Sequence, residues 1–310
     1  MRDVFAFAWL KPINGFQWVK GKSLSTGKED DFLVLVRTPK KMPEFNTYFP
    51  LEEFSGLFHT FAETPPTKTG IIDFANKYGF LEIENLESIE IGENGEQEKG
   101  ESLSFWQKEI TVMHQALELW NAVNNNDQET LSKYIRWDHD KKIIDFSLSE
   151  YIKWRPFPEP FTPFDLISPA LFCLQQVLNH HLSGRVSPQV YKRDSTNKLT
   201  LYIVPNSLIG ALWLQFAQAI DGNKEFRRCE ECRTWFELSP ETARTSKLYC
   251  SNACRSRAYR KRQAEARRLY EQGKSVKEIA EIIGTDVSTV QGWIAKKGGL
   301  TNGGQFGTKG

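Results

Sequence analysis

Histidine is scarce in this sequence: the 310 residues contain five, and none follows His181. The carboxy-terminal part therefore lacks the ligand that a zinc-dependent hydrolase or a histidine-metal nuclease needs. The chain also has no glycine-rich phosphate loop, no Gly-x-Ser-x-Gly and no paired metal-binding histidines. Three consecutive residues such as Asp138-His139-Asp140 cannot converge on one point in a regular element. We therefore predict no catalytic residues, and an activity of the amino-terminal body stays open.

Long apolar runs are missing as well. No stretch is long enough to cross a bilayer, and Met1-Arg2-Asp3-Val4-Phe5 is not followed by the sustained apolar core of a secretory signal. These absences favour a cytoplasmic protein without a membrane partner. In a reducing cytoplasm, thiols bind metal ions rather than form disulfides.

Cysteine is rare too, yet four of the five residues cluster as Cys229-x2-Cys232 and, after seventeen intervening residues, Cys250-x3-Cys254. Two thiolates two residues apart can hold one side of a Zn²⁺ ion, and a second pair can complete the tetrahedron. An all-thiolate site leaves no open position for water, so the spacing predicts a structural zinc ion. Two disulfides are the alternative, which a cytoplasmic setting disfavours.

Acidic residues are few in the same region. From Lys224 to the end, eighteen Lys and Arg stand against ten Asp and Glu, a net charge of +8, whereas residues 1–223 carry twenty-two against twenty-nine, or −7. Between Cys254 and Leu269, Glu265 is the only acid, and the absence of Gly and Pro predicts a helix with an unneutralised basic side. Such a side fits duplex phosphates, although a solvated face is the alternative. The predicted contacts on this helix are Arg255, Arg257, Arg260, Lys261, Arg262, Arg267 and Arg268.

Residues 275–295 have the pattern of two short helices that cross steeply. Ser275 can cap the first helix, Gly284 can end it in a left-handed turn, and Val290 and Trp293 of the second helix can fill the seam. This pattern predicts a helix-turn-helix, and an ordinary helical hairpin is the alternative because it obeys the same packing rules. The predicted contacts to base edges and phosphate on the second helix are Ser288, Thr289, Gln291 and Lys296.

The cysteine spacing, together with the run Tyr249-Cys250-Ser251-Asn252-Ala253-Cys254-Arg255-Ser256-Arg257, resembles the CGNR-type zinc finger of bacterial transcription regulators. The name motif Cys-Gly-Asn-Arg stands here as Cys254-Arg255-Ser256-Arg257, so only its first and last residues are kept. Residues 275–295 are separately similar to the helix-turn-helix of resolvases and sigma-factor carboxy-terminal regions. The resemblance implies a zinc module, duplex DNA as the partner and a role in transcription regulation.

Residues 1–223 are expected to form an α+β body, because 40% hydrophobic residues suffice for a sizeable core. Strands are expected at 4–10 and 32–36, a loop at 15–31 and a solvated linker at 92–101. Helices are expected at 50–58, 69–81, 103–121, 131–137, 165–184 and 208–220, a proline-rich connector at 156–163, and a hairpin at 186–191 and 198–204.

The sequence thus predicts an α+β body, a small four-cysteine zinc module and an all-α helix-turn-helix. The expected divisions are a mixed α/β region at 1–91, a mainly helical region with a β-hairpin at 101–223, the zinc finger with its basic helix at 224–262, the helix-turn-helix at 263–297 and a flexible tail at 298–310.

The predicted function is a zinc-containing, duplex-DNA-binding transcription regulator whose body senses a small-molecule or protein effector. The alternative is a defence or mobile-element effector with an unrecognised catalytic body, tethered to nucleic acid by its carboxy-terminal region. Binding to structured RNA is a third hypothesis. A homodimer stays open, since two-fold DNA sites mirror dimers.

Overall fold

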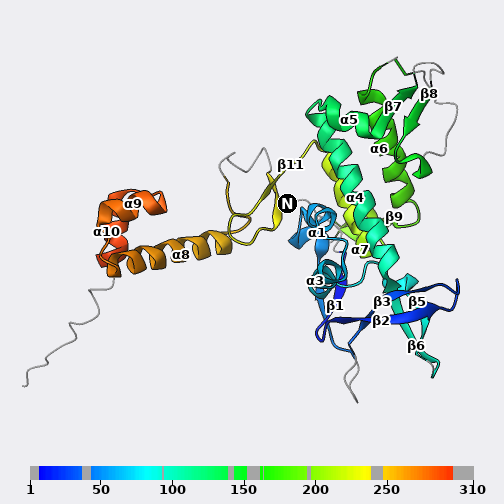
Figure 1. Cartoon of the computed structure of the whole chain (residues 1–310), viewed down its shortest axis with the longest axis horizontal. Coiled ribbons are helices and arrows are strands. Elements are labelled where there is room, and N and C mark those ends of the chain that lie inside the picture. The colour runs from blue at the N-terminus through cyan, green and yellow to red at the C-terminus, as the bar shows by residue number, and fades with distance from the viewer. Residues whose placement is uncertain are drawn as a thin grey trace, which may run out of the picture. The chain divides into compact units, whose positions relative to one another are not determined.

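The computed structural model describes residues 7–36, 43–92, 94–138, 143–151, 161–162, 164–193, 197–238 and 247–295. The chain divides into two units (Figure 1). The first unit comprises residues 1–226 and 234–242, and the second comprises residues 227–233 and 243–310. Among the residues described, no helix is both long and apolar enough to span a bilayer.

A small antiparallel barrel lies near the start of the first unit. Its strands are ordered β2-β3-β6-β5, and pairing of β2 with β5 closes the ring. Phe32, Val34 and Ile89 form a buried cluster on these strands. The strands are β2 (Phe16–Ser23), β3 (Glu29–Leu35), β5 (Glu87–Ile91) and β6 (Glu96–Ser102).

Helices carry most of the core of the first unit. The long helix α4 begins directly after β6, where the Ser102 hydroxyl accepts a hydrogen bond from the Phe105 amide. Its apolar residues recur at helical spacing, so Trp106, Ile110 and Met113 are buried on one face. The helices α2 and α6 both pack against α4 and against α7. Their bounds are α2 (Leu57–Ala62), α3 (Lys68–Tyr78), α4 (Leu103–Asn124), α6 (Ile167–Leu182) and α7 (Leu208–Asp221).

Shorter elements complete this part of the chain. The described residues also form four two-stranded sheets. They pair β1 (Trp9–Pro12) with β4 (Phe45–Tyr48), β7 (Ile135–Asp138) with β8 (Ile143–Phe146), β9 (Val186–Arg193) with β10 (Lys198–Pro205), and β11 (Glu225–Arg228) with β12 (Trp235–Leu238). The remaining helical turns are α1 (Pro50–Glu53), η1 (Ile83–Asn85), α5 (Gln128–Tyr134) and η2 (Ser149–Tyr151).

A buried polar cluster joins several elements of the first unit. Arg185 donates from Nε to Glu82 Oε1 and from Nη2 to Glu109 Oε1, both at 2.8 Å. Arg185 Nη1 lies 3.0 Å from His181 Nδ1, and the His181 ring stacks on Trp213 with centroids 4.2 Å apart. Because the Arg185 charge is paired with Glu82 and Glu109, these groups can lie next to the apolar core, whereas His181 Nε2 has no hydrogen-bond partner among the described residues.

The second unit contains three helices with a core of their own. They are α8 (Asn252–Glu271), α9 (Val276–Ile283) and α10 (Val287–Ala295). The residues buried between them are Ala266, Leu269, Ile279, Ala280, Val290 and Trp293. A single helix, α8, crosses the boundary expected between residues 262 and 263.

The expected helices at 69–81, 103–121 and 208–220 and the hairpin at 186–204 are confirmed. The loop expected at 15–31 and the linker expected at 92–101 are wrong, since they contain β2 and β6. The strand β6 is polar, and pairing with β3 and β5 holds it, whereas β2 also buries Phe16 in the main core.

Two expected helices are also corrected. The segment 50–58 breaks into α1 and the start of α2, and the segment 131–137 leaves α5 at Tyr134 and continues as β7. Most of the connector at 156–163 and the tail at 298–310 lie outside the described residues.

Candidate metal centre and nucleic-acid interface

Four cysteine side chains converge in the second unit. The Sγ atoms of Cys229, Cys232, Cys250 and Cys254 all lie within 4.8 Å of one another. Cys250 Sγ is 3.6 Å from Cys232 Sγ and 3.5 Å from Cys254 Sγ. These separations are far longer than a disulfide bond of about 2.05 Å, and close to the edge of about 3.8 Å of a tetrahedron with metal–sulfur bonds of about 2.3 Å. The four residues that the spacing predicts could therefore hold a metal ion.

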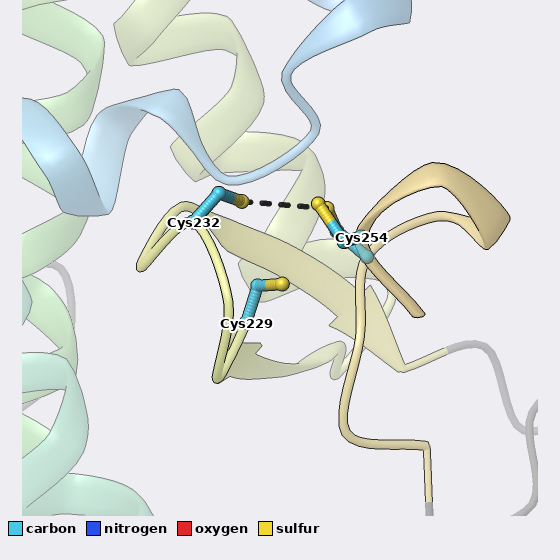
Figure 2. A group of neighbouring side chains, drawn as sticks. Cys229, Cys232 and Cys254 are labelled. Carbon is cyan, nitrogen blue, oxygen red and sulfur yellow. Dashed lines mark hydrogen bonds between the residues drawn. The ribbon is translucent and has the colours of Figure 1, made fainter. Parts of the chain in front are cut away.

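Two local structures present these sulfurs. The Cys229 carbonyl accepts a hydrogen bond from the Arg233 amide at 2.9 Å, which closes the turn that carries the first pair. The Ser251 hydroxyl caps α8 by accepting a hydrogen bond from the Cys254 amide at 3.2 Å, so Cys254 lies in the first helical turn. Figure 2 shows Cys229 and Cys232 on the loop, with their sulfurs pointing toward the side where Cys254 lies at the start of the helix.

The protein environment treats the thiols differently. Burial opposes ionisation of Cys229, but hydrogen bonds from the amides of Cys232, Cys250 and Glu231 outweigh it and lower the pKa of this thiol to about 6. Burial and the neighbouring thiols raise the pKa of Cys250 to about 12. A divalent cation would remove this conflict, because it stabilises all four thiolates together. The donor set therefore fits a thiophilic metal.

Basic side chains of α8 contact the metal centre directly. Arg257 Nη2 donates to Cys254 Sγ at 3.3 Å, and Lys261 Nζ forms an ion pair of 2.7 Å with Glu231 Oε1. Glu231 lies between the two cysteines of the first pair, and its side chain is only 10% exposed. Arg257 and Lys261 thus fasten the helix to the cysteine loop, in addition to any contact they make with a partner.

Two further cations of α8 are also engaged within the protein. Arg267 donates from Nε to the Trp293 carbonyl at 3.0 Å. Arg268 forms two hydrogen bonds with Glu265, at 2.8 and 2.6 Å. The expectation that this helix lacks acidic partners is therefore wrong at Lys261 and Arg268. The Lys261 partner could not be predicted from local sequence patterns, because Glu231 is thirty residues away.

The other three cations of α8 are available to a partner. Arg255, Arg260 and Arg262 are exposed, and within the described part of the chain their side chains make no hydrogen bond or ion pair. An Arg side chain in this state can bind a phosphate without first breaking an internal contact. These three residues are the strongest phosphate-binding candidates among the seven.

The two short helices have the ends that their sequence predicts. Ser275 and Glu278 form a reciprocal capping box at the start of α9, and Gly284 ends this helix in the left-handed conformation with φ +68°. Val290 and Trp293 of α10 pack with Ile279 and Ala280 of α9. The apolar seam expected from these residues is therefore present.

The outer side of α10 carries the predicted base contacts. Asp286 precedes the helix and accepts hydrogen bonds from the Ser288 and Thr289 hydroxyls at 2.6 and 2.7 Å and from the Thr289 amide at 2.8 Å. These bonds hold the pKa of the Asp286 carboxyl well below its usual range. Gln291 is exposed and has no side-chain partner among the described residues, whereas Lys296 lies outside them. Gln291 is thus the freest of the predicted base-reading groups.

Sequence reasoning missed the contacts that fix α8 to α10. The indole Nε1 of Trp293 donates to the Tyr259 hydroxyl at 2.7 Å, and the two rings meet edge to face. The aromatic residue at position 259 within a basic helix was the available signal, because an aromatic ring there needs a packing partner.

Other residues weighed in the sequence do not join the cysteine cluster. Cys173 is fully buried in α6, as expected for a small apolar side chain. His181 is buried in the polar cluster of the first unit, and of the Asp138-His139-Asp140 run the last two residues lie outside the described residues.

Comparison with known families gives one match. Residues 259–299 match a family model described as "Putative ATPase subunit of terminase (gpP-like)". The matched segment covers the second half of α8 and the whole of α9 and α10. Comparison with curated proteins and with solved structures gives no match. The similarity to this terminase family thus covers 41 of the 310 residues.

Proposed function

We propose that this chain is a duplex-DNA-binding protein of a phage or related mobile element. In this proposal α9 and α10 form a helix-turn-helix, α10 enters the major groove, and the exposed Arg260 and Arg262 of α8 contact phosphates. The cysteine cluster binds one structural Zn²⁺ ion, which fixes the start of α8.

The observation that carries the proposal is the overlap of three features on one segment. The terminase-like match covers both the packed pair α9 and α10 and the exposed side chain of Gln291. Arg260 and Arg262 lie on the neighbouring helix α8, and their side chains have no partner among the described residues. Phosphate contacts from such residues supply affinity, and a side chain on the groove-facing helix supplies base preference.

The zinc assignment rests on the donor chemistry. Four thiolates that can surround one ion suit Zn²⁺, and an ion held by four protein ligands has no open position for water, which makes it structural. When bound, the ion would supply a fixed link between the Cys229–Cys232 loop and α8, and Arg257 and Lys261 would brace that link.

Nucleotide hydrolysis is not assigned to the matched segment. The family description names an ATPase subunit, but residues 259–299 contain no Gly-x4-Gly-Lys-Ser/Thr loop, and neither does the rest of the sequence. We infer that the similarity concerns DNA attachment, and that the acidic body of residues 1–223 performs the effector task that this attachment serves.

The proposal is tested by selecting the zinc-loaded full chain on a random duplex DNA library. An enriched sequence is expected. Gln291→Ala should relax the preference at one or two positions and weaken binding to the preferred sequence by about 5- to 150-fold, since one base contact contributes about 1–3 kcal/mol. Tyr270→Ala serves as the control, because Tyr270 is exposed at the far end of α8 from the cysteines. No retention of duplex DNA would overturn the proposal, and preferential retention of RNA hairpins would support structured RNA instead.

A further inference from the structure

Arg233 has a backbone conformation that its residue type disfavours. It follows Cys232 directly, and its φ is +60°. Of the other described non-glycine residues with positive φ, three are Asn, which tolerates this region, and the fourth is Phe164. A glycine would adopt this conformation without strain, so the turn alone does not explain why residue 233 is an arginine.

The Arg233 side chain makes no contact that explains its presence. The residue is exposed, and its guanidinium has no hydrogen bond or ion pair with any described residue. Only its backbone takes part in the turn, through the amide bond to the Cys229 carbonyl. The side chain therefore contributes nothing visible to the fold of the cysteine loop.

A second free cation lies on the other half of the metal centre. Arg255 follows Cys254 as Arg233 follows Cys232, and the sulfurs of these cysteines lie within 4.8 Å of each other. Arg255 is exposed and its side chain is likewise without a partner among the described residues. The nearby acid Glu231 is already neutralised by Lys261. Two unpaired guanidinium groups, distant in sequence, thus flank one metal centre.

We propose that Arg233 and Arg255 form a second phosphate-binding site on duplex DNA, separate from the contacts of α10. The inference rests on the proposed function and names the partner of the cysteine module as the DNA backbone. Fourteen residues of α8 separate Arg255 from Leu269, which packs against the α9–α10 pair. At 1.5 Å per residue this is about 21 Å, or roughly six base pairs along a strand. The site therefore extends the footprint instead of duplicating it.

The test compares the salt dependence of binding for full-length, zinc-loaded variants on a 30-base-pair duplex of mixed sequence. Arg233→Gly and Arg255→Ala should each reduce the slope of log Kobs against log[salt] by about 1, which makes binding about eightfold weaker at 0.1 M salt. Arg233→Gly should keep its zinc content and lose no thermal stability, because Gly suits the left-handed turn. Arg268→Ala is the matched control, since Arg268 is exposed but paired with Glu265.

The outcomes separate this inference from the proposed function. Wild-type slopes in both Arg233→Gly and Arg255→Ala, with intact zinc and sequence preference, would overturn the second site and leave the helix-turn-helix proposal standing. Absence of duplex binding by the wild-type chain would overturn both. A slope reduced equally by Arg268→Ala would show that general charge is responsible, which also contradicts a localised site.

Discussion

Trp293 joins α10 to α8 at two points: its carbonyl accepts a hydrogen bond from Arg267, and its indole donates one to Tyr259. The ring is also 96% buried within the core of the three helices. The orientation of the helix that we assign to the DNA groove therefore depends on residues of the basic helix. The Arg267 guanidinium, which the sequence predicts as a phosphate contact, instead helps to hold α10 against α8.

Substitutions at this junction should lower stability in a graded order. Tyr259→Phe removes one hydrogen bond and should cost about 1 kcal/mol, whereas Trp293→Ala empties the core and should cost about 3–5 kcal/mol. Urea unfolding followed by circular dichroism at 222 nm would measure both changes. A loss in Tyr259→Phe as large as that in Trp293→Ala would contradict the hydrogen-bond assignment.

The free and engaged cations of α8 should behave differently in DNA binding. Replacing both Arg260 and Arg262 by Ala should weaken binding to all duplexes about equally and reduce the salt slope by about 2. Arg267→Ala should instead lower the unfolding free energy and change the slope little, because this guanidinium is occupied by the Trp293 carbonyl. Fluorescence anisotropy across a salt series checks both expectations, and equal slopes in all variants would refute the distinction.

Metal removal should unfold the cysteine module and spare the rest of the chain. Structural zinc contributes about 10–16 kcal/mol to the folding of small modules, so a chelator should expose residues 229–233 and 247–254 to hydrogen exchange. The first unit has its own large core and the α9–α10 pair has its own seam, so both should keep their protection. Cys232→Ser should reproduce the chelator effect. Retained protection of the cysteine loop after complete metal removal would contradict a structural role.

The convergence of the four cysteines was predictable because its signal is local. Cysteine spacing fixes which residues meet, and Ser275, Glu278 and Gly284 encode the ends of α9 within a few residues. The barrel was not predictable in the same way. The strand β6 has the polar sequence Glu96-Gln97-Glu98-Lys99, and its pairing with β3 and β5 supplies the stabilisation that its composition does not indicate.

Long-range polar contacts were equally invisible in the sequence. The Lys261–Glu231 pair and the Arg185 contacts to Glu82 and Glu109 join residues thirty to one hundred and three positions apart. Charge counting treats each such residue as free. Contacts formed on folding occupy some of these cations. Among the described residues, only three of the seven basic side chains predicted on α8 lack a partner and are available to bind phosphate.

Two buried groups in the first unit should give its stability an uncommon pH dependence. Burial raises the pKa of Glu101 to about 8 from an ordinary 4.5, although its carboxylate accepts hydrogen bonds from the amides of Leu81 and Glu82. Burial and the Arg185 charge lower the pKa of His181 to about 3 from 6.5. The imidazole stays neutral although Glu109 is 3.5 Å away, because Arg185 already pairs with that carboxylate.

The signs of these two shifts are opposite over part of the pH range. Between about pH 4.5 and 6.5, Glu101 is protonated in the folded state and ionised in the unfolded state. Over the same range His181 is neutral in the folded state and protonated in the unfolded state. The two states therefore bind the same number of protons at these residues, and their contributions to the pH dependence of the unfolding free energy cancel. From about pH 6.5 to 8 only Glu101 differs, and the unfolding free energy should fall by up to about 1.4 kcal/mol per pH unit. Below about pH 4.5 only His181 differs, and stability should fall as the pH decreases.

Single substitutions should separate the two contributions. Glu101→Gln should abolish the decline above pH 6.5, so stability rises from about pH 3 to 6.5 and then stays level, because the amide cannot ionise. His181→Phe keeps a ring against Trp213 and should extend the decline down to about pH 4.5. Urea titrations monitored by the fluorescence of the buried Trp residues would give these curves. A decline above pH 6.5 that persists in Glu101→Gln would place the responsible proton on another group.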